Sequence, residues 1–320
     1  MQATVQARPQ APKAGKQASR ARQQALQGLL FTLPALVLLV TFLIYPTLWT
    51  IRLSFDSGRG LRLGEWVGLD NYVRLLTRDR NFLNLSRFPP SGAVINNIIW
   101  VLLMPTLCVG LGLLIAVLTD RVRYERLIKV IIFLPMAISA TAVAIIWRFV
   151  YNPDANTGLL NAVLTTVIPG FEPVSWLGRA STVNVAIIIA AVWAQTGFAM
   201  TVLSAALKGI SLEVLEAART DGANERQVFF RIILPLLSLP ISVVTITLVI
   251  NVIKVFDIIY IMTGGGPRGA SRVIAYTMFT ETFQGGRAGY GAAVAVIMLL
   301  VIIPIMLLNI RRFKSEEVTR

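Results

Sequence analysis

The side chains that carry most enzyme chemistry are scarce in this sequence of 320 residues. It has no His and a single Cys, Cys108, which excludes Ser-His-Asp and Cys-His catalysis, His-ligated zinc and an intramolecular disulfide. The glycine run at 263–267 lacks the Gly-Lys-Ser/Thr ending of a phosphate-binding loop. We therefore expect no catalytic residue, no metal or cofactor in this chain, and no ATP hydrolysis by it alone.

Polar side chains inside long apolar stretches are the first candidates for binding. Gln195 lies in one such stretch between Trp193 and Phe198, and Asn251 lies in another, three residues before Lys254. Polar groups within a membrane are costly and are often retained for function. Amides and aromatic rings can satisfy and cover the hydroxyl groups of a bound solute.

Each of these residues also has a structural explanation. Trp193 and Phe198 can be ordinary helix packing. Gln195 and Asn251 can join neighbouring helices by hydrogen bonds. Lys254 can pair with Asp257, which lies three residues later on the same helical face.

The second candidate is the segment 208–235, which is too ordered in pattern to be a simple connector. Ser211 is a good helix N-cap, and Glu213 and Glu216 follow in the first turns, where the helix dipole favours acids. Gly222 marks the end of this helix, and a second amphipathic pattern begins after it. Such a helix pair suits docking to a partner protein or lying on the bilayer surface, and the residue pattern favours neither.

The composition places these candidates in a membrane. Hydrophobic residues make up 55% of the chain and charged residues 14%, against about 25% in a typical soluble protein. Stretches long enough to span the hydrocarbon core as helices predict an all-α, polytopic membrane protein with six transmembrane helices. They are 29–51, 94–118, 128–150, 183–207, 236–256 and 290–310.

Basic residues near the ends of these stretches predict the orientation. The net charge of +14 indicates a positive-inside bias rather than nucleic-acid binding. Placing both termini in the cytoplasm puts the basic segments 8–22, 121–129 and 311–314 inside. It also leaves an unusually basic outer loop, 52–92, which is rich in arginine and includes Arg59, Arg62, Arg74, Arg78, Arg80 and Arg87. We expect 1–28 to be a disordered basic cytoplasmic tail that can contact lipid, because it has too few apolar residues to fold.

The segment 208–235 resembles the EAA loop of ABC-importer permeases. The match runs from Glu216-Ala217-Ala218-x-x-Asp221-Gly222-Ala223 to Leu234-Pro235, between the expected fourth and fifth spans. Motifs at 68–72, 147–161 and 263–267 extend the resemblance over 29–313, to the carbohydrate branch of maltose-permease type. The stretch 133–139 is similar to α-glucoside permeases.

This resemblance implies a transmembrane domain over 29–313 with a cytoplasmic coupling loop at 208–235, followed by a short tail at 314–320. It implies ATPase coupling by the six residues Glu216, Ala217, Ala218, Asp221, Gly222 and Ala223. Solute contacts in the family fall on the stretches that hold Trp193, Gln195, Phe198, Asn251 and Lys254.

The function implied is a permease subunit of an ATP-driven, binding-protein-dependent importer of a di- or oligosaccharide, in a prokaryotic inner membrane. The partners implied are a homologous second permease, two ATPase subunits that bind ATP and Mg, and an extracytoplasmic sugar-binding protein. The alternative from another class is a gradient-driven secondary transporter. That class is expected to show ionisable residues near mid-membrane and an internal repeat, and neither is clear in this sequence.

Overall fold

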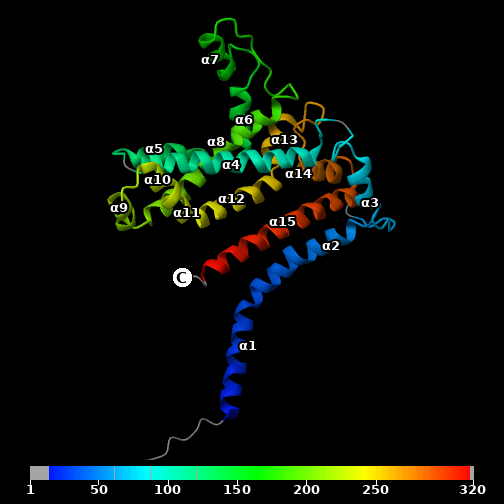
Figure 1. Ribbon diagram of the computed structural model, residues 1–320. Coiled ribbons are helices and arrows are strands. Elements are labelled where there is room, and N and C mark those ends of the chain that lie inside the picture. The colour runs from blue at the N-terminus through cyan, green and yellow to red at the C-terminus, as the bar shows by residue number, and fades with distance from the viewer. Residues whose placement is uncertain (1–13, 61, 87, 121, 318–320) are drawn as a thin grey trace, which may run out of the picture. The chain divides into compact units, whose positions relative to one another are not determined.

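The computed structural model describes residues 14–60, 62–86, 88–120 and 122–317, and it divides into two units at Arg52 and Leu53 (Figure 1). The first unit is a helical path of three elements, which are α1 (Ala14–Leu39), the π-helical turn η1 (Val40–Ile44) and α2 (Tyr45–Leu53). Its apolar part, Gln27–Leu53, has the length and hydropathy of a membrane span.

The first unit corrects one prediction. Residues 14–28, which we expected to be disordered, form the first part of α1, and residues 1–13 of the predicted tail lie outside the described residues. The reason is that Ala, Gln, Lys and Arg are strong helix formers, so a segment poor in apolar residues can still extend a helix. At the other end, α15 (Ala288–Glu317) continues past the predicted boundary at 313.

The second unit is also helical, which confirms the all-α fold. Its long membrane helices are α4 (Ala93–Thr119), α8 (Val183–Lys208) and α15. The shorter elements lie between and beside them. They are α3 (Asp70–Val73), η2 (Arg74–Arg78), α5 (Glu125–Phe133), η3 (Leu134–Ala137), α6 (Ala140–Val150), α7 (Leu159–Val167), α9 (Leu212–Thr220), α10 (Glu225–Val228), η4 (Phe229–Ile233), α11 (Leu234–Leu236), α12 (Ser238–Ile253), α13 (Asp257–Thr263), α14 (Ile274–Phe279) and η5 (Thr280–Gln284).

Two of the six predicted spans are bent. In the described part of the chain, four helices are long and apolar enough to cross a membrane, and the number rises to six if each bent pair is one span. The third span turns by 103° between Glu125–Ala137 and Ala140–Val150. The fifth is bent by 63° at its start, between Glu225–Leu236, nearly all of which belongs to the segment 208–235, and Ser238–Ile253.

The bend in the third span has a local cause. Pro135 lacks the N–H that would continue the helix, and the backbone is extended at Ile138. Ser139 then starts α6, because its hydroxyl accepts a hydrogen bond from the Ala142 amide at 3.3 Å. A further interruption follows the fifth span, where α12 ends at Ile253 and α13 begins at Asp257.

The core of the second unit forms where α4 packs along α8. A Cβ atom at Gly112 would lie 2.7 Å from the backbone nitrogen of Met200, so only glycine allows the two backbones to approach this closely. Trp100 and Cys108 on α4 are fully buried, as is Ile187 on α8. Cys108 is therefore a core residue.

Two asparagines, the buried Asn96 and the partly buried Asn184, tie the first turns of α4 and α8 to the loop between α13 and α14. Asn96 Nδ2 donates to the carbonyl oxygens of Ala270 and Arg272 at 2.9 and 2.8 Å. Asn184 Nδ2 donates to Asn96 Oδ1 and to Ala270 O, both at 2.8 Å. Because loop carbonyls buried in protein need donors, these amides fix the loop on the helix ends.

Asn96→Ala should destabilise the protein by about 1–3 kcal/mol, because it removes the side-chain donor to the Arg272 carbonyl and leaves Asn184 with one acceptor fewer. The measurement is the thermal unfolding midpoint in detergent. The matched control is Asn156→Ala, whose side chain is exposed and bonds only within its own loop. Equal midpoints for Asn96→Ala and the wild type would contradict the role given to this amide.

Candidate functional site

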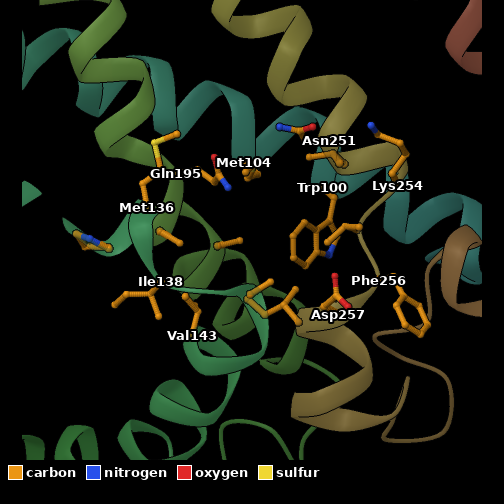
Figure 2. Close-up of a pocket in the computed structure, with 17 residues that line it drawn as sticks. Trp100, Met104, Met136, Ile138, Val143, Gln195, Asn251, Lys254, Phe256 and Asp257 are labelled. Atoms are coloured by element: carbon orange, nitrogen blue, oxygen red, sulfur yellow. The ribbon is translucent and has the colours of Figure 1, made fainter. Parts of the chain in front are cut away.

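A cavity of about 380 Å³ lies among α4, α8 and the interrupted helices (Figure 2). Trp100 and Met104 from α4 form part of its wall, and Gln195 extends toward it from α8. The remaining wall comes from the bend in the third span and from the end of α12 and start of α13. The residues shown there are Met136, Ile138, Val143, Asn251, Lys254, Phe256 and Asp257.

The two helix interruptions meet at this cavity. Pro135, Met136 and Ile138 line it from the third span, and residues 254–256 line it from the end of the fifth. Within a bilayer, non-helical backbone is tolerated only where protein buries it or where it faces a water-filled cavity. Interrupted helices around a central cavity are also the way in which many transporters build a solute site. The helix interruptions and the polar side chains therefore indicate the same cavity as the candidate binding site.

The cavity carries hydrogen-bonding groups of both kinds and one charge of each sign. Gln195 and Asn251 supply amide donors and acceptors, and Asn251, Lys254 and Asp257 are exposed. Among the described residues, Lys254 and Asp257 form no ion pair with each other, and Figure 2 shows their charged ends apart. Both charges are therefore available to a polar solute.

The structure places Gln195, Asn251 and Lys254 in the cavity wall but leaves Trp193 and Phe198 outside it. Trp193 lies two residues before Gln195 and so faces nearly the opposite side of α8. There its ring meets Trp147 edge-on, with centroids 5.9 Å apart. Phe198 packs against the hydrophobic core.

Sequence reasoning missed Trp100 and treated Asp257 only as an ion-pair partner. Trp100 is fully buried on α4, yet it contributes to the cavity wall. Nothing in the local sequence separates it from any other aromatic residue in an apolar span. Asp257 could have been found, because a carboxylate close to the end of a membrane span is unusual.

The segment 208–235 contains the two short helices expected on either side of Gly222. The Ser211 hydroxyl accepts a hydrogen bond from the Glu213 amide at 3.2 Å. After α9, the Ala223 amide bonds to Ala218 O and the Gly222 amide to Arg219 O, both at 3.0 Å. This pattern is a Schellman motif, which needs a left-handed residue at the position of Gly222, where φ is +85°.

Further bonds make this segment rigid. Asn224 and Gln227 form a reciprocal capping box at the start of α10, with distances of 2.8 and 2.9 Å. Arg219 donates to both carboxylate oxygens of Glu225 at 2.7 and 3.3 Å, and this ion pair raises the pKa of Arg219. The carboxylates of Glu216 and Asp221 remain exposed beside the exposed apolar residues Leu212, Val214 and Phe230.

An ionic cluster fixes the start of α5 to the end of α8, where the segment 208–235 begins. Lys208 Nζ lies 2.6 Å from Glu125 Oε1, and Lys129 contacts both Glu125 and the buried Ser204 hydroxyl. Farther along, α5 packs so closely on Gly197 that a Cβ there would lie 2.6 Å from Ile132 O. The segment is thus joined through α5 to Pro135 and the cavity wall.

Comparison with known proteins places these features in a family. Residues 108–310 match the family described as "Binding-protein-dependent transport system inner membrane component". The chain is 47% identical to the osmoprotective compounds uptake permease protein of Synechocystis sp., over 91% of this chain and 100% of that protein. It is 42% identical to the alpha-glucoside transport system permease protein of Rhizobium meliloti, over 90% of this chain and 82% of that one.

A solved structure shares the fold. It is a bacterial ABC transporter involved in the import of the acidic polysaccharide alginate, and it superposes with a TM-score of 0.76 at 23% identity over 95% of this chain and 99% of that one. The charged residues Lys254 and Asp257 line the cavity, as a gradient-driven transporter would require, but the family match does not support that alternative. The chain belongs to the inner membrane components, or permeases, of binding-protein-dependent transport systems.

Proposed function

We propose that this chain is one of two homologous permease subunits in an ATP-driven importer of a sugar, of di- or oligosaccharide size. Two ATPase subunits bind ATP and Mg on the cytoplasmic side, and an extracytoplasmic binding protein delivers the sugar. Both termini lie in the cytoplasm of a prokaryotic cell, and the sugar crosses by alternating access.

The observation that carries this proposal is the position of the cavity. Gln195 lies 12 residues after the start of α8 and 13 before its end, so the cavity is close to the middle of a helix about 39 Å long. A mid-membrane cavity with amides, an aromatic wall and interrupted helices suits a solute that carries many hydroxyl groups. The relatives named for alpha-glucosides, trehalose and maltose, and lactose support a sugar.

The second permease is needed because this cavity is open on one side. Asn251, Lys254 and Asp257 are exposed in the isolated chain, although they line the cavity. Polar and charged groups at membrane depth face protein or water rather than lipid. A homologous subunit opposite them would complete the wall and supply the other solute contacts.

The segment 208–235 is proposed to seat in the ATPase subunit. Its turn is rigid, and Glu216, Asp221 and neighbouring apolar residues are exposed together, which suits a protein groove with basic residues. Ala217, Ala218 and Ala223 are small enough to allow close approach. The segment continues directly from α8 and is joined to α5 by the ion pair between Lys208 and Glu125. A movement of the segment would therefore be transmitted to the cavity wall by both helices.

Gln195→Leu and Asn251→Leu should each lower sugar uptake by about tenfold or more, because buried sugar hydroxyls would lose their partners. The complex should still assemble with its ATPase subunits. Uptake into proteoliposomes is the measurement, across mono- and disaccharides. The control is Trp193→Leu, on the opposite face of α8, which should retain most of the uptake. Unchanged uptake in both cavity variants would remove these amides from the solute path.

Gly222→Val should uncouple ATP hydrolysis from uptake, because a β-branched residue resists the left-handed backbone of the turn by about 1–2 kcal/mol. No atom lies within 4 Å of a Cβ built there, so the effect is on the backbone rather than steric. Gly222→Asn is the matched control, because Asn tolerates this conformation and should retain more coupling. Glu216→Lys should weaken ATPase docking without affecting membrane insertion.

The readouts are the sugar-stimulated ATPase rate and the amount of ATPase subunit that copurifies. Full transport by a chain carrying both Gly222→Val and Glu216→Lys would contradict the coupling assignment.

A further inference from the structure

A second polar cavity, of about 480 Å³, lies at the end of α4 and α8 opposite the segment 208–235. Two loops far apart in sequence form it. Arg80, Asn84 and Ser91 come from the basic segment 52–92, and Arg268 comes from the loop after α13. Asn184 adds the first turn of α8. We call this cavity the arginine pocket.

The positive charge of the arginine pocket is not neutralised within the chain. The residues that line it include two arginines and no Asp or Glu. Among the described residues, neither Arg80 nor Arg268 has a hydrogen-bond or ion-pair partner. Both side chains are exposed, so an incoming anion can reach them.

The nearest acid along the chain, Asp79, is already fully engaged. Its Oδ2 accepts a hydrogen bond from the Tyr290 hydroxyl at 2.8 Å. Its Oδ1 accepts from the amides of Asn81 and Phe82 at 2.9 and 3.2 Å. The Asp79 carboxylate therefore bonds to groups of the fold and forms no ion pair with Arg80.

The walls of the pocket are held in place before any ligand binds. Asn84 and Ser91 pair through both backbone hydrogen bonds, at 2.8 and 3.0 Å. On the other side, Asn184 holds the Ala270 carbonyl two residues after Arg268. Arg268 itself has a φ of +50°, a conformation that costs a non-glycine residue about 1–2 kcal/mol. The backbone that carries the two arginines is therefore held before any ligand binds, and only their side chains have to be ordered when they meet a carboxylate.

The other arginines of the segment 52–92 separate into different groups. Arg74 lies over the Tyr290 ring, 5.2 Å from its centroid, and so packs within the fold. Arg59 and Arg62 are exposed but do not line the pocket. Among the described arginines of this segment, Arg80 is therefore the one that lines the pocket.

We propose that the arginine pocket receives an acidic loop of the extracytoplasmic binding protein, whose carboxylate pairs with Arg80 and Arg268. This inference rests on the proposed function, which places this end of α4 and α8 outside the cell. A protein carboxylate fits better than a lipid headgroup because both arginines lie on loops beyond the ends of α4 and α8. The pocket also gives a role to the basic outer loop, which the positive-inside rule does not explain.

The test uses the assembled complex of both permeases and the ATPases in nanodiscs, with the binding protein of the same system. Arg80→Ala with Arg268→Ala should weaken binding-protein affinity by about tenfold, and reversal of both to Glu should weaken it further. Raising the salt concentration should weaken the wild type more than the double variant. The matched control is Arg59→Glu with Arg62→Glu, which should bind like the wild type. The basal ATPase rate should be the same in all of these variants.

Each alternative outcome is distinct. Equal affinity of the wild type and both double variants would overturn the pocket. An equal loss in the Arg59 and Arg62 control would assign binding to a diffuse basic surface and overturn it as well. Anionic lipid could instead stabilise the wild type but not the Arg80 and Arg268 double variants, while all of them bind the binding protein with equal affinity. That result would assign the pocket to a lipid headgroup and overturn the proposal. Failure of the wild-type complex to bind any binding protein would instead overturn the proposed function, and the pocket with it.

Discussion

The close packing of α4 on α8 fixes the position of every functional feature of the second unit. Gly112 lets the two backbones approach at Met200, and the buried residues on either side hold the helices in register. One end of this pair carries the segment 208–235, and the other carries the asparagine network and the arginine pocket. Gln195 lies halfway between them. A rigid pair of helices can therefore hold the three proposed sites at fixed separations.

The second constraint is that backbone polar groups at membrane depth must be hydrogen-bonded or reach water. This explains why the interruptions at Ile138 and at 254–256 occur together at one cavity rather than at separate places. At each interruption, backbone N–H and C=O groups lose their helical hydrogen bonds, which would be costly if they faced lipid. Because both interruptions border the same cavity, water in that cavity can hydrogen-bond to the freed groups of both. Side-chain chemistry and backbone geometry then agree on the location of the proposed solute path.

Hydropathy and local motifs were enough to predict the all-α fold, the apolar stretches and the two helices around Gly222. They could not predict the bends, because a hydropathy average does not register what Pro135 and Ser139 do to the backbone. Nor could they separate Gln195 from Trp193, since the face of a helix that meets a cavity depends on its neighbours. Asn96 bonds to carbonyl groups of the loop 268–272, and Arg80 lines a pocket together with Arg268 of the same loop. These residues are more than 170 positions apart in the sequence, and no local pattern indicates such a relation.

The central claim is that the cavity beside Gln195 is the solute path, and its accessibility tests that claim most directly. Cys108 is the only cysteine, so a Cys108→Ala chain carrying Gln195→Cys presents one thiol to a membrane-impermeant reagent in the assembled importer. We predict that this thiol is modified, that transported sugar slows the modification, and that the accessible side of the membrane changes when ATP hydrolysis is trapped. A thiol at position 195 that stays unreactive from both sides in every state would contradict the account.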